Sequence, residues 1–308
     1  MPLRTTENII ELVGNTPLLH LGRFCRPPRA DIYAKLECRN PGGSVKDRAA
    51  LGMILDAEER GALRAGATII EPTAGNTGIG LALVGSARGY RVILCVPRGY
   101  SREKMKLMEA LGAEIEYVTE EAGMQGAIDR AKELAGEIPD SFIPQQFENP
   151  ANPGFHEQTT GREIIEQMEG RIDGVVIGAG TAGTFTGVSR AVKKINPHAV
   201  CVLVEPQGSI YGGGARGCHK VEGIGQYQFI PANFDRELAD EIMMIMDDEA
   251  FATVRRLAET EGVLGGGSTG AAAAAALRVA ERLGKGKRIV TVFPDGAERY
   301  MSQGIFDE

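Results

Sequence analysis

A loop rich in glycine and threonine follows an apolar stretch at residues 174–184 and has the residue types of a phosphate site. The segment GVVIGAGTAGT places Gly178, Gly180 and Gly183 where a strand would end and a helix would begin. Glycines let the backbone approach an anion closely, and the N–H groups at a helix start attract negative charge. We therefore expect this loop to bind a phosphate group.

The same loop fits the G-x-G-x-x-G dinucleotide fingerprint, with Glu205 placed where the acidic residue of that fingerprint would be. A nicotinamide cofactor is therefore one interpretation. The hydroxyls of Thr181 and Thr184 favour the other, because a terminal phosphate has more oxygens to bind than a pyrophosphate. The loop by itself does not decide between them.

A lysine follows two glycines in the segment NPGGSVKDR, residues 40–48. In one interpretation Ser44 or Asp47 caps a helix and Lys46 is solvated. In the other, Lys46 is an amine held at a cleft, which forms a Schiff base if burial keeps it partly neutral. The Walker spacing G-x-x-x-x-G-K-[ST] is absent.

The segment EPTAGNTGIG, residues 71–80, sets hydroxyl and amide side chains among glycines at an expected strand–helix junction. Thr73, Asn76 and Thr77 there could receive a carboxylate, because helix starts bind small anions. The alternative is an ordinary strand–helix turn. The histidines His20, His156, His198 and His219 show no metal-pair spacing. We therefore expect surface or capping histidines and no metal site.

The chain alternates apolar, β-branched runs with helical segments, which is typical of an α/β fold with parallel sheets. We expect strands at residues 32–37, 68–73, 91–97, 114–119, 174–179, 200–206 and 288–294. A Pro-, Asn- and Gly-rich break near residues 144–154 predicts two doubly wound domains, 1–145 and 146–308. An alternative is that the first ~35 residues pack on the second domain.

Composition excludes several classes of partner. The net charge of −7 argues against a nucleic-acid-binding surface. The sequence has no apolar run long enough to span a bilayer. The five cysteines are scattered without C-x-x-C spacing, so neither a zinc site nor a disulfide framework is expected. This cysteine usage predicts a cytoplasmic location.

Taken together, the motifs stand in a distinctive order: VGNTPLL, AKLECRNPGGSVKDR, EPTAGNTGIG, PQQFENPANP, GAGTAGTFTG, KVEGIG, GGGSTGAA and PDGAERYMS. This order resembles the cysteine synthase and cystathionine β-synthase family over residues 8 to 304. These are pyridoxal-phosphate (PLP) enzymes of the tryptophan-synthase-β-like fold, also called fold type II. The resemblance implies PLP bound between two α/β domains, a small-molecule amino-acid substrate and a homodimer.

The resemblance also implies a role for each motif. Lys46 matches the lysine that binds PLP as a Schiff base and moves the Cα proton. The other residues matching the cofactor site are Asn76, Gly180, Thr181, Ala182, Gly183, Thr184 and Gly296. Those matching the substrate site are Thr73, Ala74, Gly75, Asn76, Thr77, Gln146, Glu222, Gly223, Ile224 and Gly225.

The implied reaction is a β-replacement on O-acetyl-L-serine, with sulfide giving L-cysteine and acetate. Homocysteine as the thiol is the alternative, because the segments EPTAGNTG and KVEGIG are closer to O-acetylserine-dependent cystathionine β-synthases, and Glu222 could meet the larger thiol. Ala74 and Gly296 depart from the commonest pattern by lacking a hydroxyl. Gly296 leaves Asp295, a backbone group or water as the partner of the PLP ring nitrogen. An NAD-dependent oxidoreductase and an inactive scaffold are the rivals from other classes.

Overall fold

The computed structural model describes residues 5–307, and the chain forms two compact units. The first unit contains Met1–Val13, as far as it is described, and Asn40–Asn152. The second unit contains Gly14–Arg39 and Pro153–Glu308, with the same restriction at its end. The domain limits expected from the sequence, 1–145 and 146–308, stay a prediction.

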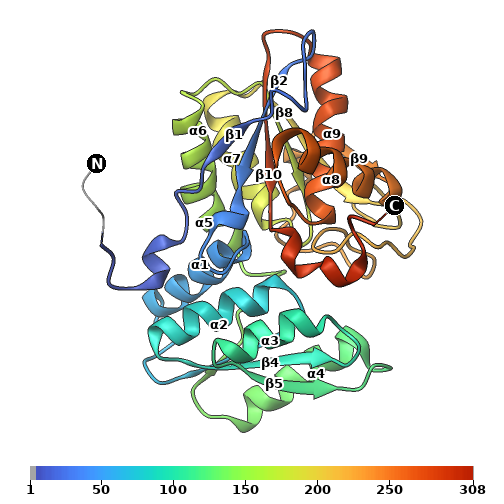
Figure 1. Ribbon diagram of the computed structural model, residues 1–308. Coiled ribbons are helices and arrows are strands. Elements are labelled where there is room, and N and C mark those ends of the chain that lie inside the picture. The colour runs from blue at the N-terminus through green and yellow to red at the C-terminus, as the bar shows by residue number, and fades with distance from the viewer. Residues whose placement is uncertain (1–4, 308) are drawn as a thin grey trace. The chain divides into compact units, whose positions relative to one another are not determined.

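The strands of Figure 1 are β1 Leu18–His20, β2 Asp31–Leu36, β3 Thr68–Pro72, β4 Arg91–Pro97, β5 Glu114–Val118, β6 Ser141–Phe142, β7 Gly174–Gly178, β8 Val200–Pro206, β9 Glu241–Ile245 and β10 Arg288–Phe293. The α-helices are α1 Lys46–Glu59, α2 Asn76–Arg88, α3 Arg102–Ala110, α4 Gly123–Glu137, α5 Ala151–His156, α6 Arg162–Gln167, α7 Gly183–Ile195, α8 Asp247–Glu261 and α9 Gly267–Leu283. A π-helical turn, η3 Glu157–Gly161, joins α5 to α6. Short 3₁₀ helices are η1 Ile9–Leu12, η2 Glu37–Arg39, η4 Arg236–Leu238, η5 Ala297–Arg299 and η6 Met301–Gln303.

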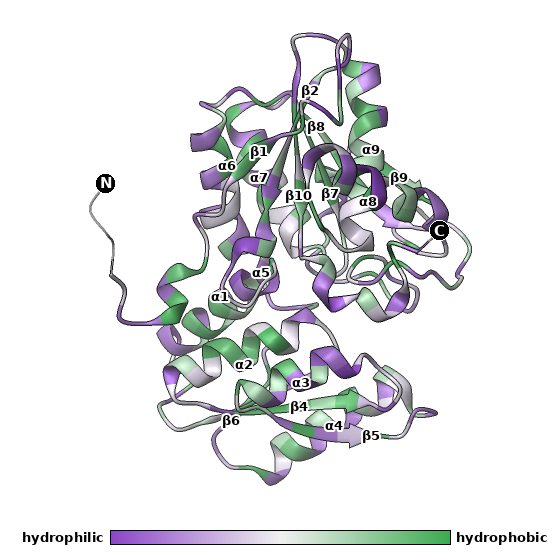
Figure 2. Cartoon of the chain, viewed as in Figure 1, coloured by the Kyte–Doolittle hydropathy of each residue, from purple (hydrophilic) through white to green (hydrophobic). Residues whose placement is uncertain are grey.

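The first unit is built on a parallel sheet with the strand order β5-β4-β3-β6. Ile70 and Ile93 pack with Ala127 and Ala131 of α4 on one face. Figure 2 shows β4 as largely hydrophobic, and every residue of it after Arg91 is buried, as expected of a strand covered on both sides. Helix α1 lies directly against α2, because a Cβ on Gly80 would be 2.8 Å from the carbonyl oxygen of Lys46.

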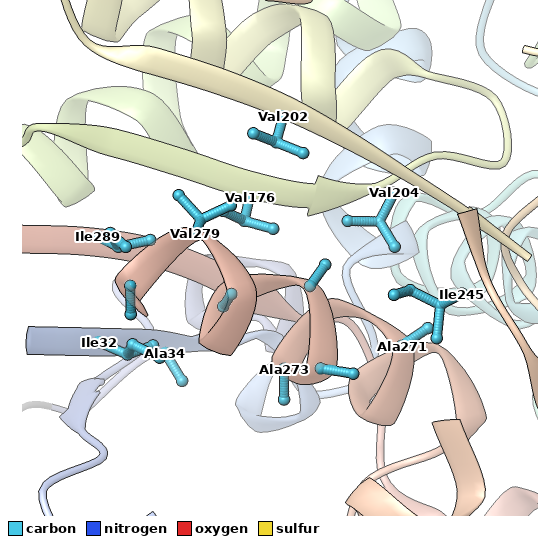
Figure 3. Close-up of a cluster of buried hydrophobic side chains, with 14 of the residues drawn as sticks. Ile32, Ala34, Val176, Val202, Val204, Ile245, Ala271, Ala273, Val279 and Ile289 are labelled. Atoms are coloured by element: carbon cyan, nitrogen blue, oxygen red, sulfur yellow. The ribbon is translucent and has the colours of Figure 1, made fainter. Parts of the chain in front are cut away.

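The second unit is built on a sheet with the order β1-β2-β10-β7-β8-β9, parallel except for β1. Its two faces carry separate apolar clusters. Val176 and Val202 pack with α8 and α9 on one face, where Figure 3 shows Ala271, Ala273 and Val279 of α9. The other face packs with α6 and α7. The central strands β10, β7 and β8 are therefore buried on both sides.

The fold class expected from the sequence is confirmed: the protein is α/β with mainly parallel sheets. Each strand expected from the sequence is present, with ends within one residue of the expected ones. The sequence interpretation missed β1, β6 and β9. In the described residues, no helix has the length and apolar character needed to cross a membrane.

Candidate active site

Lys46 is the first residue of α1 and is half-buried. The loop before it is held by its own polar groups. The Lys46 N–H donates to Ser44 Oγ at 3.2 Å, and the Gly42 N–H donates to Asp47 Oδ2 at 2.5 Å. Asn40 Nδ2 donates to the carbonyl of Ser44 at 3.1 Å. Ser44 and Asp47 therefore fix the backbone of this loop. The Lys46 side chain takes no part in these contacts, which use its backbone N–H.

The turn Thr73–Thr77 connects β3 to α2, as expected of an anion-receiving turn. Its N-cap residue is Gly75, and no side chain caps α2. Uncapped N–H groups at a helix start attract a negative charge. Thr73, Ala74 and Thr77 are buried, whereas Gly75 and Asn76 are half-buried.

Gln146 lies beside this turn although it is far away in the sequence. The Thr77 hydroxyl donates to Gln146 Oε1 at 2.6 Å, and both side chains are buried. The structure thus brings together two of the residues expected to receive a carboxylate. This contact depends on β6 lying next to β3 in the sheet.

The carboxyl group of Glu71, at the end of β3, is fully buried in the same region. Glu71 Oε2 accepts from the Gln145 N–H at 3.0 Å, and Oε1 accepts from the Gln146 N–H at 3.1 Å. Burial raises the pKa of Glu71 to about 7, against the two backbone N–H groups, which lower it. The sequence interpretation did not single out Glu71.

The loop Gly180–Thr184 leads from β7 into α7. Ala182 has φ 62°, a left-handed conformation, and precedes a helix with no side-chain cap. Thr181 Oγ1 accepts from the Gly183 N–H at 3.4 Å. Two donors fix the Gly180 carbonyl: the Tyr211 hydroxyl at 2.7 Å and Gln226 Nε2 at 3.3 Å. The backbone of this loop is therefore fixed, and it leads into a helix start whose N–H groups have no side-chain cap.

The segment Gly223–Gly225 runs beside this loop. The Gly225 N–H donates to the Ala179 carbonyl at 2.7 Å, and a Cβ on Gly180 would lie 2.6 Å from the Gly223 carbonyl oxygen. Gly223 and Gly225 have φ 84° and 91°, which glycine adopts without strain. The structure thus brings together the two segments expected to bind the cofactor phosphate and to line the substrate site.

Glu222, just before this segment, is half-buried, and its Oε1 accepts from Gln303 Nε2. Gly296 is buried and pairs with Gly265 in an isolated bridge. A Cβ on Gly296 would lie 2.1 Å from Glu298 Oε2, so a serine there would first have to displace that side chain. The carboxylate of Asp295 accepts from the Tyr300 hydroxyl.

Glu205, the acid of the dinucleotide interpretation, instead accepts hydrogen bonds from the backbone. It is buried, and its two oxygens accept from the N–H groups of Tyr211 and Gly212 at 2.9 and 3.0 Å. Burial raises the pKa of the Tyr211 hydroxyl, which keeps it protonated as a donor to the Gly180 carbonyl. This arrangement speaks against a ribose contact at Glu205.

His156 corrects an expectation, because it is neither a surface nor a capping residue. It is 1% exposed, with Nδ1 2.8 Å from the Thr160 hydroxyl and Nε2 3.2 Å from the Thr184 hydroxyl. It therefore links η3 to the loop Gly180–Thr184. The i, i+4 spacing of His156 and Thr160 in a helical segment was the only local signal for this contact.

We expect His156→Ala to lower the free energy of unfolding by about 1–3 kcal/mol, because the hydroxyl of the buried Thr160 loses its partner. Urea unfolding followed by circular dichroism measures the change. His198→Ala, at an exposed histidine, is the control and should change stability by less than about 0.5 kcal/mol. Equal stability of the two variants would contradict the prediction.

The expected site residues divide between the two units. Lys46, the turn Thr73–Thr77 and Gln146 belong to the first unit. Residues 180–184, 222–225 and 296 belong to the second. Each unit thus carries one of the two glycine-rich turns before an uncapped helix, and the first also carries the amine of Lys46. In the part of the chain that the structure describes, no cluster of His, Cys, Asp and Glu could hold a metal ion.

Comparisons with known proteins agree with this chemistry. Residues 9–295 match the family described as "Pyridoxal-phosphate dependent enzyme". The chain is 46% identical over 308 residues to a cysteine synthase of Staphylococcus aureus, covering 99% of each chain. It is 48% identical over 300 residues to the O-acetylserine-dependent cystathionine β-synthase of Bacillus subtilis, covering 97% of each.

Solved structures give the same fold. The crystal structure of an O-acetylserine-dependent cystathionine β-synthase from Helicobacter pylori superposes with a TM-score of 0.92 at 43% identity, over 99% of this chain and 100% of that one.

Proposed function

The chain belongs to the family of pyridoxal-phosphate-dependent enzymes, and we propose that it replaces the acetoxy group of O-acetyl-L-serine with sulfide to give L-cysteine and acetate. The observation that carries the proposal is the turn Thr73–Thr77, where an uncapped helix start and the Thr77–Gln146 pair suit an amino-acid carboxylate. The cysteine synthase relative, which is similar over the whole chain, supports the same substrate class.

The residues of the second unit fit a phosphate group such as that of PLP. A Cβ on Gly180 would fill space already bounded by the Gly223 carbonyl, and α7 begins without a side-chain cap. We assign the phosphate to the backbone and hydroxyls of Gly180–Thr184. Lys46 would hold the cofactor aldehyde, Asn76 its 3′ oxygen, and Gly296 would stand at its ring nitrogen.

PLP, when bound, supplies an electron sink for negative charge at the substrate Cα. The residues of the chain supply the binding of the substrate and the transfer of the proton. The turn Thr73–Thr77 with Gln146 binds the substrate carboxylate, which fixes the direction of the Cα–H bond. Lys46 Nζ takes the Cα proton as a general base, the Cβ–O bond breaks, and acetate leaves with the electron pair. Hydrosulfide then forms the Cβ–S bond, and Lys46 returns the proton to Cα.

Two positions differ from the pattern expected of cysteine synthases. Ala74 offers no hydroxyl to the carboxylate, so the Thr73 hydroxyl, the Gln146 side-chain amide and the helix N–H groups, including that of Thr77, would bind it. Gly296 offers only its backbone at the ring nitrogen, while the neighbouring Asp295 carboxylate already accepts from Tyr300. A backbone N–H or a water that donates to that nitrogen would leave it unprotonated.

A second candidate function uses homocysteine in place of sulfide and gives cystathionine. The relative of Bacillus subtilis supports it, as does the carboxylate of Glu222, which Gln303 holds in one orientation. A fixed carboxylate near the substrate segment Gly223–Gly225 could bind the ammonium group of a larger thiol. Sulfide has no such group, so the two substrates should respond differently to loss of this charge.

We expect the purified holoenzyme to form cysteine from O-acetyl-L-serine and sulfide faster than it forms cystathionine with homocysteine. Glu222→Gln should lower the ratio of kcat/KM for homocysteine to that for sulfide by about 10-fold, because a charged hydrogen bond is lost. Product formation, quantified by chromatography, measures both rates. Glu237→Gln, at an exposed carboxylate of η4, should leave the ratio unchanged.

A faster rate with homocysteine would identify the second function as the principal one. No product with either thiol would reject O-acetyl-L-serine as the donor.

We also propose a homodimer that acts in the cytoplasm. The thiols of Cys25, Cys95 and Cys201 are free and buried, which agrees with a reducing compartment.

A further inference from the structure

The carboxylate of Glu71 fixes the backbone segment that positions Gln146. It lies near the end of β3, is 1% exposed, and each of its oxygens accepts from one backbone N–H, of Gln145 at 3.0 Å and of Gln146 at 3.1 Å. Gln145 has φ 55°, a left-handed conformation that is unusual for a residue with a side chain. The carboxylate thus stabilises a turn that the sequence alone does not favour.

Gln146 is fixed from three directions. Glu71 binds its N–H, Asn152 Nδ2 donates to its carbonyl at 2.9 Å, and the Thr77 hydroxyl donates to its side-chain oxygen at 2.6 Å. The strand that carries Glu71 runs directly into the turn Thr73–Thr77. One carboxylate therefore connects both parts of the proposed substrate-carboxylate site.

We propose that Glu71 is a positioning residue that sets the place of Gln146 and thereby the affinity of the turn Thr73–Thr77 for the carboxylate of the amino-acid substrate. The inference rests on the proposed function, since that function assigns the carboxylate to this turn. Glu71 touches neither substrate nor cofactor in this scheme. It acts through Gln146.

The surroundings of Glu71 make its hydrogen bonds with the backbone of Gln145 and Gln146 depend on pH. Burial raises its pKa to about 7, so it is ionised above that pH and protonated below it. A protonated carboxyl loses acceptor capacity towards one of the two N–H groups. The hold on Gln145 and Gln146 should therefore weaken as the pH falls through 7.

Few charged groups face Glu71 from the elements packed on β3. Helix α2 lies against β3, since a Cβ on its Gly85 would be 3.8 Å from Ile69, and its charged residue is Arg88, which pairs with Glu58. On β4, Cys95 interacts with its charge, and Arg91 at the other end pairs with Glu114. β6 consists of uncharged residues. Helix α4 turns Ala127, Ala131 and Leu134 to the sheet, and its charged residues are exposed or half-buried. These are Asp129, Arg130, Lys132, Glu133 and Glu137.

The test compares Glu71→Gln with the wild-type holoenzyme in the binding of L-serine and of L-serinamide, which lacks the carboxylate. Binding is followed by the visible absorbance of the cofactor at pH 6 and pH 8. The ratio of mutant to wild-type Kd at each pH removes the titration of the ligand's own amine. For L-serine we expect a ratio of about 10 at pH 8, because an acceptor is lost, falling towards 1 at pH 6. For L-serinamide it should stay near 1.

Glu114→Gln is the matched control, because Glu114 is an exposed carboxylate of the same sheet. The ratio of the Glu114→Gln Kd to the wild-type Kd should be 1 for both ligands. Should Glu71→Gln not fold, the amide resonances of Gln145 and Gln146 in the wild-type chain are followed by NMR. They should move with a midpoint near pH 7, and constant shifts from pH 6 to 8 would overturn the proposal.

A ratio of 1 for L-serine at pH 8 would also overturn it, as would equal ratios for the two ligands, which would indicate a general loss of structure. Neither ligand carries an acetyl group, so the comparison does not depend on the donor. Failure of the proposed function would instead appear as no product from O-acetyl-L-serine and sulfide with the wild-type enzyme.

Discussion

Lys46→Ala is expected to lower kcat for β-replacement by about 10³-fold or more, because the variant loses the group that moves the Cα proton. It should also lose the visible absorbance of lysine-bound PLP while still binding the cofactor through Gly180–Thr184. Steady-state product formation and an absorbance spectrum after dialysis measure the two effects.

The structure indicates that this variant will fold. Lys46 begins α1, where alanine is a favourable residue. The contact that α2 makes with Lys46 uses its backbone carbonyl, which alanine retains. Lys106→Ala, at an exposed lysine of α3, is the control and should keep full activity. Undiminished turnover by Lys46→Ala would remove Lys46 from the reaction.

Gly180→Ala is expected to raise the Kd for PLP about 5- to 150-fold, since overpacking against a rigid neighbour costs about 1–3 kcal/mol. The added Cβ would lie 2.6 Å from the Gly223 carbonyl oxygen, which is backbone and has little freedom to move. The loop has little freedom to retreat either, because Tyr211 and Gln226 both bind the Gly180 carbonyl. Absorbance titration of the cofactor-free protein with PLP gives the Kd.

Gly214→Ala is the control for this measurement. Gly214 is exposed, and its added Cβ would meet only the Ser209 carbonyl oxygen at an ordinary 3.5 Å. PLP affinity should therefore stay at the wild-type value. An unchanged Kd for Gly180→Ala as well would show that the phosphate binds elsewhere.

The sequence predicted the strands that carry the site because their pattern is local. A run such as residues 200–204 is apolar throughout and is soon followed by a turn signal, so it identifies a buried parallel strand. The missed strands lack that signal. β1 and β6 are very short. β9 has the sequence EIMMI, where methionine gives little β-preference.

The site was predictable in the same measure. Lys46, the turn Thr73–Thr77 and the loop Gly180–Thr184 each lie at a strand–helix or loop–helix junction, where neighbouring residues already fix the chemistry. By contrast, Glu71 and His156 were missed. Their partners are given by packing: Gln145 and Gln146 for Glu71, and Thr184 for His156.

The sequence by itself therefore determined the α/β class, most of the strands and the places of the glycine-rich turns, because hydrophobic periodicity and glycine placement act between near neighbours. Only the tertiary structure decided that Gln146 meets Thr77 and Glu71. That contact requires β6 to lie beside β3 rather than elsewhere in the sheet. Strand order depends on how whole elements bury their faces against one another, and no local pattern records it.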